Sequence, residues 1–517
     1  MASNGSLCGD RAATVSAAFW FGRVDLLPLS LMRVTFGVAT LWSTIALSPV
    51  LFPLFSDAGV MPIGSLLSKV ARINRVSLFD IARPDWLLVA LYVMTLAALV
   101  CFTIGYRTRL SSVLSFILLT GLYERNLYAV TGASEIYRVV LFWLMFLPCG
   151  QHISFDSFFP RSKAPVSPAA GGAFRVRLCQ AQIAWIYLSG GLYKLDGASW
   201  RSGEAVHIAL GAKHVFTRSL GDWMFQYPVI TSWVTYYTIA VELAFALLMF
   251  WPFVGQSSTG SGSNVRSATK AVGLVLGCGL HVGLLASLKV QYFSLGALAS
   301  YPIFFEAGWL RRSWIGHLFW LPVRAEADSA CWQEARCGSS MGHLQAIFAR
   351  IEWSFVPWRT LGDAGLLLVL VASCVNRAPP QLHVSTPAVV SETVEELELW
   401  QQWNMGAPDP LAVDFYLRGE GTLRDGTHVD ALQGIVPEMG QSYYWTEYLK
   451  SIAFGKDNSP WTAEFGRYIC RTWNGLPLRG ETDLVTFNLY REEQKIPLSG
   501  EILGPWIGVE IWNHHCF

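Results

Sequence analysis

The stretch from Tyr187 to Trp200 reads YLSGGLYKLDGASW and places Lys194 and Asp196 at the end of a long apolar run. A charged side chain at the depth of a bilayer costs several kcal/mol unless it is paired, hydrated or close to the membrane surface. Side chains that are kept there despite this cost usually have a function. Lys194 is therefore the first candidate for chemistry.

The chemistry that suits Lys194 is general-base catalysis. An amine in apolar surroundings favours its neutral form, and a neutral lysine accepts protons at physiological pH. Gly190 and Gly191 carry no side chain, so they permit the close approach of another helix or of a flat ligand. The aromatic rings that could stack on such a ligand are those of Trp185, Tyr187 and Tyr193. The pattern predicts a site for a lipophilic, ionisable substrate that arrives through the membrane.

Further polar side chains lie inside or beside apolar runs and carry both signs of charge. They are Arg33, Glu124, Arg125, Glu135, Arg138, Asp196, Glu242 and His281. Buried ion pairs and anchors at the membrane surface explain such residues as well as catalysis does, and for Glu242 and His281 both interpretations stay open. Asp196, Glu242 and Arg33 are candidates for supporting the lysine, together with Trp200 in the motif itself.

The elements that position these residues are predicted to be membrane helices. Hydrophobic residues make up 52% of the 517 residues and charged residues 15%, whereas a soluble domain carries about 25% charged residues. The 22 Trp, 18 Tyr and 30 Phe supply aromatic belts for the membrane surface. The net charge of +1 gives no reason to expect nucleic acid as a partner. We expect a polytopic protein in the lipid bilayer.

About 20 mostly apolar residues are needed to span a membrane, and nine segments qualify or come close. They are residues 26–52, 86–105, 108–124, 136–150, 177–195, 229–254, 271–288, 290–306 and 361–376. The fourth and ninth are short, so either could be re-entrant. The fold class that this predicts is an all-α polytopic membrane bundle of about nine transmembrane helices, followed by a soluble α+β domain.

The character of the chain changes after Pro379-Pro380, where charges become common and long apolar runs stop. Residues Thr422–Val429 alternate around an Asp-Gly turn and predict a hairpin. Leu484–Tyr490 and Gly508–Trp512 predict strands, and Trp461–Trp473 predicts a helix. The predicted organisation is a polar segment 1–20, a transmembrane domain 21–306, a cytoplasmic connecting loop 307–360, a last transmembrane helix 361–376 and an extramembrane α+β domain 381–517.

Charge bias and cysteine usage bear on location. The connections on the N-terminal side of the predicted membrane carry the larger share of Lys and Arg, which predicts a cytoplasmic N-terminus and a C-terminal domain on the external or lumenal side. The ten cysteines form no C-x-x-C motif, so neither a thioredoxin-like redox motif nor a zinc site is predicted. Cys470 and Cys516 could pair if their region faces an oxidising compartment.

The motif around Lys194 resembles that of the vitamin K-dependent gamma-carboxylase family, and the chain looks closest to its bacterial-type relatives with an HTTM domain. The resemblance begins with Tyr187–Asp196 and the following Trp200–Glu204. Other stretches that agree are Gly105–Arg109, Phe142–Gly150, Ser154–Asp156, His281, Phe293–Leu298, Leu399–Met405 and Asp425-Gly426. The similarity covers residues 20–306 and, more weakly, residues 395–475.

The resemblance implies a specific chemistry for Lys194. In the family, a lysine at this position deprotonates reduced vitamin K, oxygen adds and an epoxide forms, and carbon dioxide then adds to a glutamate of a peptide or protein. It implies that Lys194 and His281 are catalytic. It also implies that the residues around Gly190 bind reduced vitamin K or a menaquinol-type naphthoquinone, with molecular oxygen and carbon dioxide as co-substrates.

Three departures from the family pattern leave peptide carboxylation open. Gln151 stands where the carboxylase has a histidine, Tyr193-Lys194 replaces a pair of lysines, and the extramembrane part is short. The alternative function is a non-catalytic quinone- or lipid-binding membrane scaffold. A transporter is less favoured, because the hydropathy shows no inverted repeat.

Overall fold

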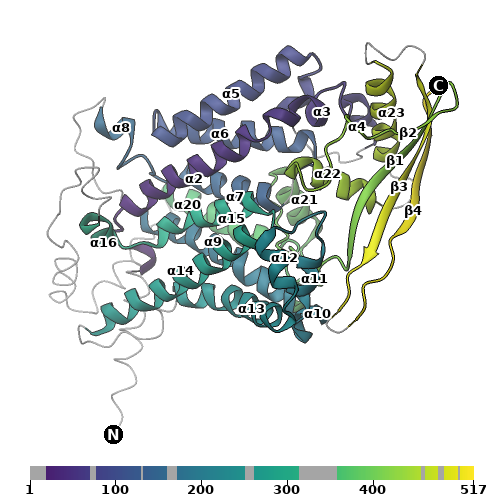
Figure 1. Cartoon of the computed structure of the whole chain (residues 1–517). Coiled ribbons are helices and arrows are strands. Elements are labelled where there is room, and N and C mark those ends of the chain that lie inside the picture. Colours follow the sequence, from purple (N-terminus) through teal and green to yellow (C-terminus); the bar gives the residue numbers. More distant parts are fainter. Residues whose placement is uncertain are drawn as a thin grey trace, which may run out of the picture.

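The computed structural model is mostly helical, with a bundle of helices and a four-stranded sheet packed at one end of it (Figure 1). We call this the sheet end. The structure describes residues 19–69, 77–129, 132–159, 172–250, 261–313, 358–455, 460–475, 482–498 and 501–517. Most of the predicted polar segment 1–20 and most of the predicted loop 307–360 lie outside the described residues.

A helix lies in each of the nine predicted ranges. These helices are α2 (Leu27–Ile45), α5 (Asp85–Ile104), α6 (Thr108–Arg125), α7 (Gly132–Phe146), α9 (Gly172–Leu195), α13 (Pro228–Phe250), α14 (Ser261–Ser287), α15 (Gln291–Ser300) and α20 (Trp358–Val375). Within the described residues, four stretches are long and apolar enough to cross a membrane: Leu27–Phe55, Asp85–Ile104, Pro228–Phe250 and Ser267–Ser287. The structure therefore supports a membrane protein, but nine full crossings are not shown.

Length and position explain why α7, α9 and α15 are not among the four. At 1.5 Å per residue, the 15 residues of α7 and the 10 of α15 extend about 22 and 15 Å, short of the ~30 Å hydrocarbon core. Helix α9 has 24 residues but carries Arg175, Arg177, Gln180 and Gln182 in its first half. It packs against α13, α20 and α7. Gln180 and Gln182 are buried there, whereas Arg175 and Arg177 are half-buried.

The helices form a closed circuit of neighbours. Helix α9 packs on α13, α13 on α14, α14 on α15, α15 on α2, α2 on α5, α5 on α6, α6 on α7, and α7 again on α9. Short helices fill the connections: α3 (Leu51–Phe55), α4 (Ile63–Lys69), α8 (Phe155–Phe158), α10 (Ala198–Ser202), α11 (Ala205–Gly211), α12 (Ser219–Phe225) and α16 (Ala307–Arg312). Lys194 is buried at the last turn of α9, and the neighbouring Gly197 and Trp200 contact residues 406–408, just before the sheet.

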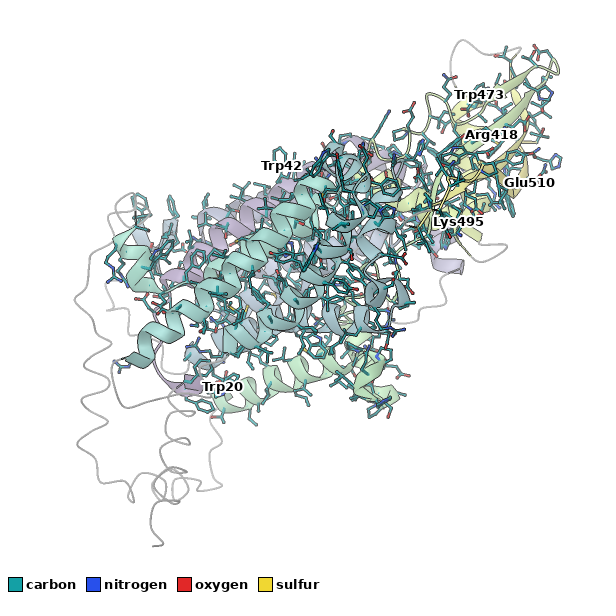
Figure 2. All side chains as sticks on the ribbon, turned by 60° about the horizontal axis from the view of Figure 1, so that its bottom comes forward. Trp20, Trp42, Arg418, Trp473, Lys495 and Glu510 are labelled. Atoms are coloured by element: carbon teal, nitrogen blue, oxygen red, sulfur yellow. A yellow bond between two sulfur atoms is a disulfide. The ribbon has the colours of Figure 1, made fainter. Side chains whose placement is uncertain are left out.

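Large apolar side chains cover the outside of the bundle, as expected for a surface that faces lipid. Trp42 on α2 is 62% exposed and lies at the outline of the bundle (Figure 2), and Trp233 on α13 is also exposed. Val93 on α5 and Val275 on α14 are exposed in the same way. A soluble monomer rarely leaves so much contiguous apolar surface open, so the pattern supports a bundle in a bilayer.

The C-terminal region combines helices with an antiparallel sheet. Its elements are α21 (Ala388–Glu396), β1 (Val413–Leu423), β2 (His428–Asp430), α22 (Tyr443–Ala453), α23 (Pro460–Asn474), β3 (Leu484–Lys495) and β4 (Ile507–His515), and the strand order is β2-β1-β3-β4. The predicted hairpin is confirmed: Gly426 has a φ of +85°, and the carboxylate of Asp425 accepts a hydrogen bond from the Thr427 amide. The predicted strands and helix are confirmed as β3, β4 and α23.

One hydrophobic core runs from the bundle into the C-terminal region. The hydroxyl of Tyr444 on α22 donates a hydrogen bond to the carbonyl of Ser43 on α2, at 2.8 Å. Trp403, between α21 and β1, is fully buried in the same core. The two parts are therefore in intimate contact, and the boundary at residue 381 stays a prediction.

Candidate functional site

Lys194 is buried at the end of α9 and paired with a carboxylate. Its side chain is almost fully enclosed, with the residue 4% exposed. The amine lies 3.0 Å from one carboxylate oxygen of Glu242 on α13 and 2.9 Å from the other. The ring of Trp200 lies 5.2 Å from the amine in a cation–π arrangement. Of the four residues proposed to support the lysine, Glu242 and Trp200 therefore contact it directly.

The pairing changes the chemical argument for Lys194. The sequence predicted an amine kept neutral by apolar surroundings, with Asp196, Glu242, Trp200 and Arg33 as supporting residues. The structure places the carboxylate of Glu242 directly against that amine. Buried charges tend to be neutralised, and at this distance the amine and the carboxylate can share one proton. The acid–base unit is thus the Lys194–Glu242 pair, and not the lysine alone.

A second polar group lies deeper in the bundle, on the same face of α9. Tyr187 precedes Lys194 by seven residues, about two helical turns or 10 Å. Its hydroxyl lies 2.7 Å from Nε2 of His281 on α14 and 2.7 Å from the hydroxyl of Tyr301, which follows α15. His281 is 1% exposed, and its Nδ1 has no hydrogen-bond partner in the described part of the chain. These side chains form a hydrogen-bonded chain, Tyr301–Tyr187–His281, that ends in a free buried acceptor or donor.

Aromatic rings line this chain on one side. The ring of Phe245 on α13 stacks on Tyr187 at 4.2 Å and on Tyr301 at 5.4 Å, measured between ring centroids. Phe245 lies one helical turn beyond Glu242 on the same helix. The two polar groups and the rings therefore occupy one α9–α13 interface, with α14 and the end of α15 closing its side.

Gly190 and Gly191 lie where α9 faces α13, and the absence of side chains there lets the two helices pack closely. A Cβ at Gly191 would lie 2.8 Å from Leu243 Cδ2 and 3.2 Å from Glu242 Cβ, whereas a Cβ at Gly190 would meet nothing closer than 3.4 Å. The close contact that the sequence left open between a helix and a flat ligand is made here by a helix.

The two glycines give a matched pair of tests. Gly191→Ala should lower protein stability by about 1–3 kcal/mol, because the Leu243 side chain and Cβ of Glu242 must shift to make room for the added methyl group. Gly190→Ala should be near neutral, because its Cβ has room and alanine favours a helix. Thermal unfolding of both variants in the same detergent checks this. Equal midpoints for the two variants would contradict the tight α9–α13 contact at Gly191.

The other predicted residues lie farther from the pair. The hydroxyl of Tyr193 donates a hydrogen bond to the Arg377 carbonyl at 2.5 Å, which ties α9 to the end of α20. Trp185 is half-buried and packs against the hydrophobic core. Asp196 is exposed. None of these three has a described contact with the Lys194 amine, so the structure supports no direct part for them in proton transfer.

Arg33 lies in a different place, at the junction of α2 with α5 and α8. Its guanidinium donates hydrogen bonds to the carbonyls of Phe102 and Ile153. Gly105, with a φ of +74°, ends α5 beside it, and a side chain at Gly105 would overlap the guanidinium. Asp156 caps the start of α6 through the Arg107 and Thr108 amides. Two stretches that carried the family resemblance therefore meet here, in a structural junction.

Several residues of the site were not found from the sequence. Tyr301 and Phe245 lie in apolar runs where nothing distinguishes them from packing residues. Gln182 and Gln401 exchange amide hydrogen bonds at 2.6 and 3.1 Å, across 219 positions of sequence. Asp409 accepts hydrogen bonds from Ser199. A glutamine in the middle of a predicted membrane helix was the one available signal, since such a residue needs a buried partner.

No group of three or more His, Cys, Asp or Glu residues within the described ranges could hold a metal ion.

The family model for the HTTM domain matches residues 21–309, which is 289 of the 517 residues and more than half of the chain. No curated protein and no solved structure matches the chain.

Proposed function

Because this chain belongs to the HTTM domain family, whose domain is found in vitamin K-dependent carboxylase and in bacterial HTTM-domain proteins, we propose that it is a membrane enzyme that oxidises a reduced naphthoquinone. The observation that carries the proposal is the buried Lys194–Glu242 pair, 2.9–3.0 Å apart. It lies about two helical turns from the chain Tyr301–Tyr187–His281.

The chemical character of these residues fits a quinol. A naphthoquinol has two ionisable hydroxyls on flat apolar rings, and this part of the bundle offers two separate hydrogen-bonding groups with the ring of Phe245 stacked beside one of them. His281 Nδ1, buried and unpartnered in the described structure, is a free position for a hydroxyl. The fit rests on the set of donors and acceptors that the α9–α13 interface brings together.

The overall reaction balances with oxygen as oxidant. One quinol and one dioxygen give one quinone epoxide and one water, so the quinol is oxidised and dioxygen is reduced. The Lys194–Glu242 pair contributes by taking the hydroxyl proton: Glu242 holds a proton that leaves Lys194 neutral, and the amine then accepts the proton of the quinol. The bundle around the pair excludes water. The balance needs no carbon dioxide, so a coupled addition of carbon dioxide to a peptide glutamate is a separate step of the proposal.

A direct assay tests this function. The protein in lipid nanodiscs is supplied with reduced vitamin K or a reduced menaquinone under air, and the epoxide is sought by mass spectrometry. Epoxide that forms faster than in a control with empty nanodiscs supports the proposal. Its absence with every naphthoquinol tried would contradict it.

A binding scaffold is the alternative, and one observation favours it. The Lys194–Glu242 pair bridges α9 and α13 beside the tight contact of Gly191 with Leu243, as an ion pair with a purely structural role would. The two functions differ in their demands, because a scaffold needs the shape at this position and an enzyme needs the titrating groups.

We also propose that the nine helices together form the membrane domain, with the N-terminus in the cytoplasm and the sheet end outside. The charge bias of the connections supports this orientation. The disulfide between Cys470 on α23 and Cys516 after β4 supports it too, because structural disulfides persist in oxidising compartments.

The disulfide gives a test of this orientation. Acid trapping of intact cells, followed by thiol labelling, should find Cys470 and Cys516 oxidised. Their replacement by serine should cost about 2–4 kcal/mol of stability, because the bond closes a loop across 46 positions. Two free thiols in trapped cells would place the sheet end in a reducing compartment and contradict the proposed orientation.

A further inference from the structure

Residues 398–409 leave the C-terminal region and re-enter the sheet end of the bundle without forming a helix or strand. Leu399 and Gln401 are buried, and Trp403 is 0% exposed. We call residues 398–409 the re-entrant strap. An irregular segment is seldom buried, because its backbone polar groups need partners, so the contacts that hold this one show what it does.

The middle of the strap is bonded to α9. Gln401 exchanges two side-chain amide hydrogen bonds with Gln182, and the indole of Trp403 donates to the side-chain Oε1 of Gln401 at 3.0 Å. The Trp403 carbonyl lies 3.5 Å from the position that a Cβ of Gly190 would occupy. Gly190 is one turn from Lys194, so the strap reaches the face of α9 that carries the lysine.

The first end of the strap is fixed by an ion pair. Arg138 on α7 lies 3.4 Å from a carboxylate oxygen of Glu398, and all but a small part of both side chains is buried. The Arg138 guanidinium also lies 5.1 Å from the ring centroid of Trp400. This end joins the strap to α7.

The second end closes over Lys194. The indole of Trp200, which lies against the Lys194 amine, donates a hydrogen bond to the Gly406 carbonyl at 2.8 Å. The backbone oxygen of Pro408 fills the space where a side chain of Gly197 would be. Strap and α10 therefore form one continuous cover over the end of α9.

Asp409 holds the strap to α10 by hydrogen bonds, and we call this contact the clasp. Its carboxylate accepts hydrogen bonds from the Ser199 amide at 2.7 Å, from the Ser199 hydroxyl and from the Ala198 amide at 3.3 Å. Burial acts to raise the pKa of Asp409, but the bonds from Ser199 and Ala198 outweigh it, and the pKa is lowered. The clasp is therefore ionised and closed at neutral pH.

We propose that the re-entrant strap seals Lys194 from the aqueous phase at the sheet end, so that the site takes a membrane-soluble ligand from the bilayer, and that Asp409 holds the seal. The proposal deepens the proposed function, on which it rests for the role of Lys194. Its test measures access and not turnover, so that failure of one is distinguishable from failure of the other.

The test compares two thiol reagents on Lys194→Cys protein in lipid nanodiscs, where both aqueous faces are open. A sulfonated maleimide, confined to water, should label the variant no faster than the wild type. N-ethylmaleimide, which enters the bilayer, should label the introduced thiol, as located by peptide mass spectrometry, apart from the free cysteines that the wild type already has. Adding Asp409→Ala should speed labelling by the sulfonated reagent about tenfold or more, because charge-assisted hydrogen bonds are lost. Adding Asp425→Ala, which removes an exposed acid of the β1–β2 turn, should change nothing.

A second measurement keeps Lys194 in place. Hydrogen exchange of the Ala198 and Ser199 amides should be slow in the wild type and in Asp425→Ala, and fast in Asp409→Ala. Rapid labelling of Lys194→Cys by the sulfonated reagent with Asp409 intact would overturn the seal. Unchanged labelling and exchange in Asp409→Ala would contradict the role of Asp409 in holding the seal. Failure of N-ethylmaleimide to label the Lys194→Cys variant would contradict entry of the ligand from the bilayer.

Discussion

Lys194→Arg should abolish detectable epoxidation of a reduced naphthoquinone while the protein still folds. Arginine keeps a positive charge beside Glu242, 2.9 Å from the present amine, so the buried carboxylate keeps a partner. A guanidinium stays protonated in proteins and cannot accept a proton. Loss of a general base typically costs a factor of about 10²–10⁴ in rate, and the epoxide measured by mass spectrometry should fall by at least the lower of these factors.

The control for this prediction is the same substitution at an exposed position. Lys495 at the end of β3 has a side chain that is 70% exposed and lies 3.6 Å from Glu501, so Lys495→Arg should keep full activity. Thermal midpoints of both variants should lie close to that of the wild type. Full activity in Lys194→Arg would remove the role of Lys194 as a base and leave it only the role of a charge.

The general outline of this site could be predicted from the sequence, because ionisable residues inside apolar runs can be recognised there. A lysine, a glutamate or a histidine inside an apolar run is costly in a membrane unless it is paired, hydrated or near the surface, so Lys194, Glu242 and His281 stand out by their position in the sequence. What the sequence does not contain is which of them meet. Glu242 reaches Lys194 because Gly191 lets α13 lie close to α9, whereas Asp196, two residues from the lysine, points to solvent.

In the fold, too, local features could be predicted from the sequence and long-range contacts could not. Helix positions follow from apolar runs, and the β1–β2 hairpin follows from the Asp425-Gly426 turn, since both are set by local chemistry. The number of crossings does not follow, because α9 is polar where other helices cover it and α15 is short where 301–304 continue it as a 3₁₀ turn. The re-entrant strap has no local signal at all: its course is fixed by partners such as Gln182, more than 200 residues away.

Removing one partner of the Lys194–Glu242 pair should destabilise the protein strongly, and removing both should restore most of the loss. Lys194→Met leaves the Glu242 carboxylate buried without a counter-charge. Glu242→Leu likewise leaves the Lys194 amine buried without a counter-charge. Breaking a buried pair in this way costs about 3–5 kcal/mol, whereas replacing both partners by apolar side chains of similar volume is often neutral or stabilising. Thermal unfolding of the two single variants and the double variant measures the coupling between them.

The double variant Lys194→Met/Glu242→Leu also separates the enzyme from the scaffold. It is expected to fold with close to wild-type stability and to form no epoxide, because it keeps the α9–α13 contact and has lost the titrating groups. Lys495→Met, at the exposed pair with Glu501, should change stability by less than about 1 kcal/mol. Single variants as stable as the wild type would show that the pair is not buried in the folded protein. A stable double variant with full activity would leave the pair a structural bridge, as a scaffold requires.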